Sequence, residues 1–105
     1  MQCRGIRGAI TISANNKKSI LTATEELLLE MTQANKIEIK DIAAIFFSTT
    51  SDLNAEFPAV ATRELGWPSN LALFYGHEMN VPNGLPRCLR ILDRKLATPS
   101  TRTKP

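Results

Sequence analysis

Residues 44–50, AIFFSTT, are the stretch that indicates the fold most directly, because a short apolar run followed by polar residues is typical of a buried strand. The segment before it predicts a helix that Asn15 or Asn16 can cap and that runs to about Ala34. One face of that helix carries apolar residues at helical spacing, namely Ile20, Leu27, Leu28, Met31 and Ala34. Residues 39–44 are expected to form a short helical turn that leads into the strand.

Three further strands are expected on either side of this central part. Residues 5–12, GIRGAITI, are rich in β-branched and small residues and predict an opening strand. Residues 71–75 predict a third strand, and residues 87–92, RCLRIL, predict a fourth because their character alternates. A turn is expected between them at residues 82–84, PNG.

A short helix and a polar tail complete the chain. Pro58 supplies a preset φ for the start of a helix that is expected to end near Gly66. From Asp93 onward the apolar pattern stops, and DRKLATPSTRTKP is expected to form neither helix nor strand. We therefore divide the chain into one domain, residues 1–93, and a divergent tail, residues 94–105, that is expected to be disordered.

The length and composition fit a small soluble domain. With 105 residues the chain can form one compact domain but can hardly enclose a ligand pocket alone, so we expect it to form oligomers. Hydrophobic residues make up 43% and charged residues 22% of the sequence, the usual balance of a globular protein. No stretch is apolar and long enough for a signal peptide or a membrane helix. We expect a cytoplasmic protein with no membrane partner.

The net charge of +3 comes from the carboxyl-terminal end of the chain. Four of the 13 basic residues lie in the last twelve positions, where no acidic residue offsets them: Arg94, Lys95, Arg102 and Lys104. Without these four, 9 basic residues face 10 acidic residues, which is a net charge of −1. A face that binds nucleic acid would need a basic excess of its own. We therefore expect no nucleic-acid partner.

The cysteines and the histidine do not predict a metal site or a disulfide. Cys3 and Cys88 have no CxxC spacing, and His77 is the only histidine in the chain. In a reducing compartment such cysteines remain free thiols and pack as small hydrophobic residues. We expect no bound metal and no disulfide.

The residues that favour a function are arginines. No Gly-rich phosphate loop, nucleophile elbow or HExxH motif is present in the sequence. Arg7, Arg63 and Arg90 lie near the ends of predicted strands or on the predicted short helix, and Glu78 lies beside a predicted strand terminus. A guanidinium is planar, permanently charged and rich in donors, so this set favours an anionic ligand.

Three motifs of the chain resemble those of the AroH-type chorismate mutases. They are RGIRGA at residues 4–9, DLNAEFPAVATREL at residues 52–65 and HEMNVPNGLPRCLR at residues 77–90. Each motif is unusual by itself, and all three occur in the same order and at the same spacing as in that family. The resemblance covers nearly all of residues 3–92.

This resemblance implies an α+β fold in which a mixed β-sheet carries helices on one face. It also implies a homotrimer in which the sheets of three subunits form a pseudo-α/β-barrel core, with active sites at the subunit interfaces. The implied activity is the isomerisation of chorismate to prephenate in aromatic amino-acid biosynthesis. A homotrimer agrees with the oligomer that the chain length predicts.

The resemblance also implies roles for single residues. Arg7 would bind a carboxylate, Glu78 would contact the substrate hydroxyl, and Arg90 would be the central arginine. Six further residues match substrate-binding positions. Phe57 and Ala59 would form a pocket wall from the facing subunit, Arg63 would lie near the pocket mouth, and the pocket strand would carry Leu73, Phe74 and Tyr75. The family often has cysteine at the position of Tyr75, so only a backbone contact carries over there.

Several of these residues also have ordinary structural interpretations. Arg7 and Arg90 can be strand arginines that face solvent, and Glu78 can simply end a strand. Arg63 fits a solvated helix face as well as it fits a ligand contact. Phe57 is typical of an apolar residue that packs against a helix start, and it can serve both purposes.

The implied reaction explains why arginines would suffice. A concerted pericyclic shift needs no proton transfer and no nucleophile, so no cofactor is expected. The enzyme must hold a flexible dianion in a compact form and stabilise the negative charge that grows on the ether oxygen. Arg90 could bridge a carboxylate and that oxygen, while Arg7 would hold the other charged end.

The chain departs from the family at two places. Val60 stands where the family commonly has a lysine at the pocket edge, which would weaken the binding of a dianion. Beyond Asp93 the closing strands of the family, one of which carries a pocket tyrosine, are not recognisable. The alternative function is therefore a non-catalytic trimeric binding or structural protein on the same scaffold, inactivated by loss of the carboxyl-terminal segment.

Overall fold

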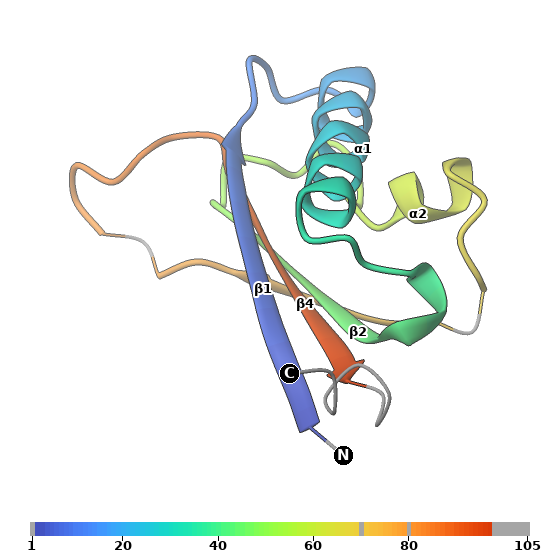
Figure 1. Cartoon of the computed structure of the whole chain (residues 1–105). Helices are drawn as coiled ribbons and strands as arrows, with labels where there is room; N and C mark the ends of the chain where they lie inside the picture. The colour runs from blue at the N-terminus through green and yellow to red at the C-terminus, as the bar shows by residue number, and fades with distance from the viewer. Residues whose placement is uncertain (1, 70, 80, 98–105) are drawn as a thin grey trace.

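The computed structural model describes residues 2–69, 71–79 and 81–97. Its elements follow the chain in the order β1 (Gln2–Thr11), α1 (Lys17–Ala34), η1 (Ile39–Asp41), β2 (Ile42–Thr49), α2 (Val60–Glu64), β3 (Ala72–His77) and β4 (Cys88–Ala97). Figure 1 shows the strands as one layer with α1 and α2 on the same side of it. Within the described ranges, no helix is both long enough and apolar enough to cross a bilayer.

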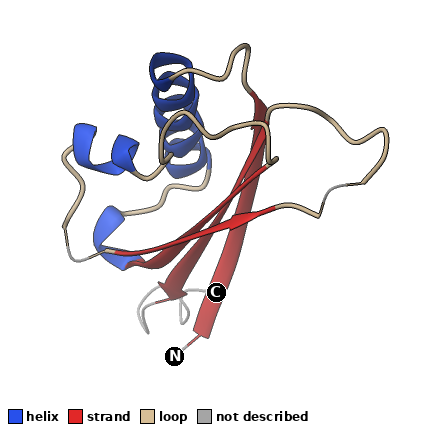
Figure 2. Ribbon diagram, turned by 180° about the vertical axis from the view of Figure 1, so that it is seen from behind, coloured by secondary structure: helices blue, strands red, loops and turns tan. Residues whose placement is uncertain are grey.

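The four strands form one mixed sheet with the order β1-β4-β2-β3. β4 runs antiparallel to both of its neighbours, β1 and β2. β3 runs parallel to β2 and forms an edge of the sheet. The view from behind shows all the helices on one face of this sheet (Figure 2). The expected α+β fold, a mixed sheet with helices on one face, is confirmed.

α1 begins and ends where the sequence predicts. The side-chain oxygen of Asn16 accepts a hydrogen bond from the N–H of Ser19 at 2.8 Å, which caps the first turn. The predicted apolar face is buried except at Ala34, which is exposed because it lies in the last turn. A Cβ atom added at Gly8 would lie 2.7 Å from Sδ of Met31. Gly8 therefore allows α1 to approach β1 closely.

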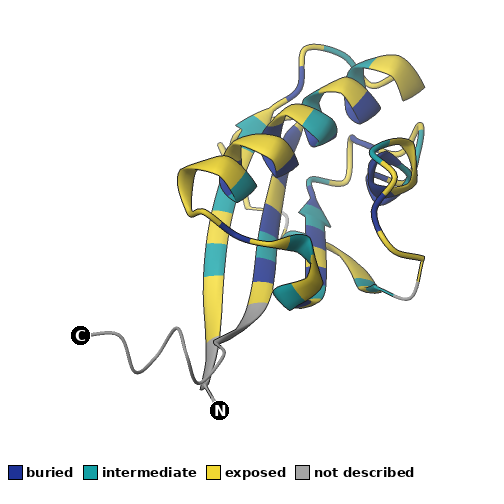
Figure 3. Ribbon diagram, turned by 45° about the vertical axis from the view of Figure 1, so that its right-hand side comes forward, coloured by how far each residue is buried: buried dark blue, intermediate teal, exposed yellow. Residues whose placement is uncertain are grey.

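The two faces of the sheet have different surroundings. Side chains on the face toward the helices are buried, as Leu89 and Ile91 are in β4 and Ile45 and Phe47 are in β2. Figure 3 shows buried segments alternating with more exposed ones along the strands. The opposite face, which we call the open face, has no helix over it among the described residues. Strand alternation and register place on it Arg7, Ala9, Phe46, Ser48, Phe74, Arg90 and Leu92.

β4 extends further than the sequence predicts. Residues 93–97 continue the strand to Ala97, so the expectation that no strand forms beyond Asp93 was wrong. β4 lies between β1 and β2, and Asp93 pairs in register with Ile6 on one side and with Ile45 on the other. Backbone hydrogen bonding to two neighbours stabilises the strand here despite its polar side chains. Residues 98–105 of the predicted tail lie outside the described residues.

Other boundaries differ by a few residues. β1 begins at Gln2 rather than at residue 5, and β2 begins at Ile42, directly after η1, rather than at residue 44. β3 begins at Ala72 and continues to His77, two residues past the predicted end. α2 is shorter than predicted because residues 57–62 first form turns with hydrogen bonds between residues i and i+3.

Candidate active site

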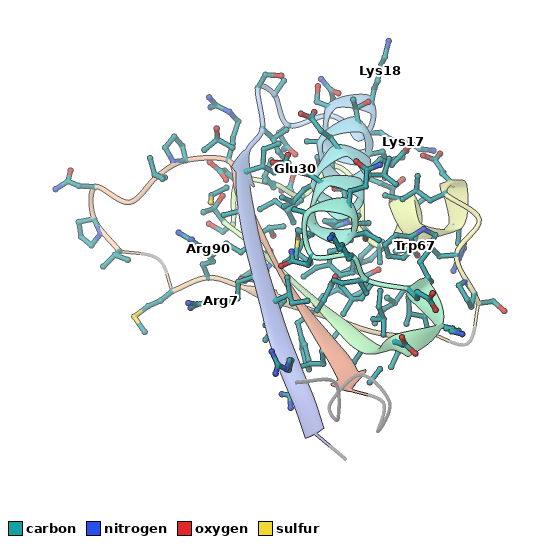
Figure 4. All side chains as sticks on the ribbon, viewed as in Figure 1. Arg7, Lys17, Lys18, Glu30, Trp67 and Arg90 are labelled. Carbon is teal, nitrogen blue, oxygen red and sulfur yellow. The ribbon has the colours of Figure 1, made fainter. Side chains whose placement is uncertain are left out.

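Arg7 and Arg90 lie close together on the open face of the sheet. The antiparallel register pairs Ala9 with Arg90 and Arg7 with Leu92, so the two arginines are diagonal neighbours on adjacent strands. Both side chains point away from α1, and they lie next to each other in Figure 4. They line a hollow of about 580 Å³ whose other walls are mostly apolar: Gly8, Ala9, Phe46, Ser48, Ile91 and Leu92.

Glu78 forms an ion pair with Arg90 between its Oε1 atom and the Nε atom of the guanidinium. The N–H of Glu78 donates a hydrogen bond to the carbonyl oxygen of Thr49 at 2.9 Å, which fixes the residue just after β3. Oε1 is buried, and Arg90 supplies the charge that compensates it. The Arg90 side chain is 54% exposed, so its guanidinium remains accessible to a ligand while it is paired.

Arg90 connects two hollows. It lines the hollow that contains Arg7, and with Glu78 it lines a second hollow of about 400 Å³ beneath the loop between β3 and β4. The three residues that the sequence analysis assigned to catalysis are therefore brought together, with Arg90 between the other two. Two cations and one carboxylate, those of Arg7, Arg90 and Glu78, thus line two hollows that share Arg90.

A second group of predicted residues lies at the β3 edge on the helix side of the sheet. The rings of Phe57 and Tyr75 lie 5.2 Å apart, and Tyr75 also stacks on Phe47 at 6.0 Å. Phe57 and Tyr75 line a third hollow of about 400 Å³ together with Glu56 and other residues. Burial raises the pKa of Tyr75, and the positive charge of Arg63 acts in the opposite direction, which places Arg63 near this ring.

The remaining predicted residues are more structural in their positions. Ala59 is buried in the hydrophobic core, and Leu73 is partly buried and packs against that core. Phe74 is on the open face, where its ring stacks on Phe46 at 5.0 Å. Arg63 is exposed on α2. The predicted site residues thus fall on opposite faces of the sheet, and no hollow described above contains members of both groups.

Ser48 lines the hollow of Arg7 and Arg90 but was not among the predicted site residues. It pairs in register with Arg90, and its side chain lies on the same face as Phe46. Strand alternation could have found it, because residues 44, 46 and 48 must share a face. Residues 44–50 were predicted only as a buried strand, and no ligand contact was assigned to them.

The thiol and acidic groups show no metal-binding arrangement in the described part of the chain. No three histidine, cysteine, aspartate or glutamate residues gather there. Cys88 is a free, buried cysteine, and burial raises the pKa of its thiol. The guanidinium groups of Arg7 and Arg90 on the open face suit an anionic ligand.

Comparisons with known proteins assign the chain to a family. The model of the family "Chorismate mutase type I" matches residues 3–104, beyond residue 92, where the motif resemblance ended. The chain is 44% identical over 90 residues to the chorismate mutase AroH of Thermus thermophilus, covering 85% of this chain and 73% of that protein. It is 37% identical over 92 residues to the chorismate mutase AroH of Bacillus subtilis, covering 88% of this chain and 72% of that protein.

A solved structure supports the same family assignment. A chorismate mutase from Clostridium thermocellum superimposes with a TM-score of 0.84 and 41% sequence identity, covering 88% of this chain and 81% of that one. Arg7, Arg90 and Glu78 lie within the residues that the family model matches. The chain belongs to the type I, or AroH-type, chorismate mutase family.

Proposed function

We propose that this protein is an isomerase that converts chorismate to prephenate, with Arg90, Arg7 and Glu78 as its working residues. The observation that carries the proposal is the placement of Arg7 and Arg90 side by side in one hollow, with Glu78 paired to Arg90. Two permanently charged cations next to apolar walls suit a small dianion with an apolar ring. Family membership supports the same activity.

The reaction breaks the ether carbon–oxygen bond of chorismate while a carbon–carbon bond forms, and the electrons move within one molecule. No atom is gained or lost, so the protein has to supply geometry and electrostatics only. Arg7 binds one carboxylate and thereby selects the compact conformer, which lowers the entropic cost of reaching the transition state. Arg90 donates to the ether oxygen as negative charge develops there.

The ion pair with Glu78 makes Arg90 more effective. Glu78 engages the Nε side of the guanidinium, so the terminal N–H groups remain available to the ligand. A donor held in place before the ligand arrives requires no reorganisation during the reaction. The second carboxylate oxygen of Glu78 can accept a hydrogen bond from the ring hydroxyl of the substrate.

The proposal includes a homotrimer with sites shared between subunits. The two groups of site residues lie on opposite faces of one sheet, so a complete site requires the Phe57 and Tyr75 side of one subunit to meet the Arg90 side of another. Large apolar side chains are exposed on both parts, including Phe57, Phe74, Tyr75 and Met79. Such surfaces are typical of subunit contacts.

A turnover assay combined with a mass measurement tests the proposal. Purified protein should consume chorismate and form an equal amount of prephenate, with the same rate in the presence of a metal chelator. Sedimentation should give three times the 11.6 kDa mass of the chain. A trimer that binds chorismate but forms no prephenate would establish the non-catalytic alternative instead.

A cytoplasmic location remains part of the proposal. The free thiol of Cys88 supports it, because a reducing compartment keeps such thiols unpaired. Fractionation of cells that make the protein should recover the turnover activity with cytoplasmic marker enzymes.

A further inference from the structure

The loop between β3 and β4 has its ends fixed at the end of β2. Glu78 begins this loop, and Arg90 is the third residue of the strand that follows it, so both site residues depend on how the ends are held (Figure 1). At one end the N–H of Glu78 donates to the carbonyl of Thr49 at 2.9 Å. At the other end the N–H of Thr50 donates to the carbonyl of Cys88 at 3.0 Å.

The carboxylate of Asp52 ties the second end by its side chain. The N–H of Arg87 donates to Oδ1 and Oδ2 of Asp52 at 3.2 and 3.0 Å. The hydroxyl of Thr50 donates to Oδ1 at 2.5 Å and accepts from the N–H of Cys88 at 3.0 Å. Two successive backbone N–H groups just before Arg90 are thus held, directly or through one hydroxyl, by a single carboxylate.

Arg87 needs such support because its backbone is in the left-handed region, with φ of +46°. Residues other than glycine persist there only where their surroundings hold them. The carbonyl of Ile12 accepts from Nε of Arg87 at 2.8 Å, and the N–H of Ile12 donates to the carbonyl of Arg87 at 2.7 Å. Asp52 holds Arg87 from one side and Ile12 holds it from the other.

The same hydrogen bonds keep Asp52 ionised. The hydroxyl of Thr50, and then the N–H of Arg87, lower the pKa of Asp52 because they stabilise its carboxylate form. Asp52 lines the hollow that contains Glu78 and Arg90. A negative charge at this place would repel an anionic ligand. The carboxylate therefore suits a role in holding the backbone better than a role in contacting the ligand.

We propose that Asp52 is a positioning residue for the isomerase reaction, an inference that rests on the function proposed above. It acts through Thr50 and Arg87 on the backbone before Arg90, and so sets where the guanidinium meets Glu78 and the ligand. A displacement of about 1 Å at a reacting centre can lower a rate by about 100-fold.

The test compares Asp52→Asn and Asp52→Ala with Asp41→Asn, a matched change at the opposite end of β2. Two quantities are measured for each folded variant: the steady-state constants for chorismate, and the NMR signal of the Arg90 Nε–H, identified by its loss in Arg90→Lys. Both Asp52 variants should lose at least about tenfold in kcat/KM, mostly in kcat. Their Arg90 Nε–H should exchange faster with water, as is also expected for the control variant Glu78→Gln, which weakens the ion pair directly.

A second pair of variants covers the case in which the Asp52 variants do not fold. Thr50→Val removes the connecting hydroxyl, and Thr50→Ser keeps it. Thr50→Val should reproduce both effects, and Thr50→Ser should restore kcat and the exchange rate to within about twofold of the unaltered protein. A role confined to stability would lower the melting temperature of Thr50→Val but would leave its kcat equal to that of Thr50→Ser.

Two results would overturn the inference. One is an unchanged kcat/KM and Arg90 signal in folded Asp52→Asn and Asp52→Ala, and the other is an equal loss in Asp41→Asn. Should the unaltered protein form no prephenate, the proposed function fails, but the exchange rate of the Arg90 Nε–H still reports whether Asp52 positions that side chain. The two failures are therefore distinguishable.

Discussion

The guanidinium of Arg90 pairs with the carboxylate of Glu78 across the two ends of the loop between β3 and β4. This pair is complete within one subunit, and it lies next to Arg7 on the same side of the sheet. The cation that the proposed reaction needs is thus held in place before any ligand or partner subunit arrives. A preorganised cation of this kind is what a reaction without proton transfer requires.

Replacement of Arg7 should weaken substrate binding and also lower turnover, because Arg7 both anchors a carboxylate and selects the compact conformer. Arg7 is exposed and lies diagonal to Arg90, so it can anchor a carboxylate without touching the bond that breaks. Arg7→Ala should raise KM for chorismate by at least about tenfold, since charge-assisted contacts contribute roughly 1.5–3 kcal/mol. Arg7→Lys should recover only part of this loss. A KM that stays unchanged in Arg7→Ala would remove Arg7 from the site.

Mixed trimers should regain activity that each parent variant lacks. Arg90→Ala damages one side of the proposed interface site, and the double change of Phe57→Ala with Arg63→Ala damages the other. After the two proteins are unfolded and refolded together in equal amounts, about a quarter of the sites should combine two intact halves. The prephenate rate of the mixture is compared with that of each variant refolded alone. Activity no higher than the sum of the parents would place the site within one subunit.

Asp93 should make the protein less stable at neutral pH than in mild acid. It is fully buried, neither carboxylate oxygen has a hydrogen-bond partner among the described residues, and burial raises its pKa from 3.8 to about 6. The folded state therefore binds this proton more tightly than the unfolded state does. The stabilising contribution is greatest below about pH 4 and is lost as the pH rises through about 6.

Asp93→Leu is the variant that isolates this contribution. The rise in the pKa of Asp93 from 3.8 to about 6 corresponds to on the order of 3 kcal/mol of stability. At pH 7.5 Asp93→Leu should therefore unfold at a higher urea concentration than the unaltered protein. The difference in unfolding midpoint between Asp93→Leu and the unaltered protein should shrink at pH 4.5, where Asp93 is protonated in the folded state. Urea unfolding at one fixed protein concentration measures both values. Equal differences at the two pH values would mean that the carboxylate is compensated by a partner.

Local sequence signals predicted the elements that depend on local interactions. Asn16 caps α1 as its position suggested, and the apolar run of β2 forms a buried strand. The end of β4 could not be predicted in this way. Asp93 and Arg94 are poor strand residues, but the ladders with β1 and β2 hold their backbone in the sheet. That pairing is set by the fold as a whole.

The candidate site was likewise predicted only in part from the sequence. Arg7 and Arg90 were found from the sequence, and strand alternation explains why they share a face. The resemblance implied that Phe57 comes from the facing subunit, but the contact of its ring with Tyr75 was not predicted, because it depends on tertiary packing at the β3 edge. The role of Asp52 could not be predicted from the sequence, because its hydrogen bonds reach a residue 35 positions later in the chain.

The turnover of an Arg90 series measures the central claim most directly. Arg90→Ala removes the proposed donor to the ether oxygen, whereas Arg90→Lys keeps a positive charge but loses the planar set of donors. Loss of one preorganised donor costs about 3 kcal/mol or more, so kcat for Arg90→Ala should fall at least about 100-fold in a protein that still folds and assembles. Arg90→Lys should fall between Arg90→Ala and the unaltered protein. A folded, assembled Arg90→Ala protein that forms prephenate at the unaltered rate would contradict the account.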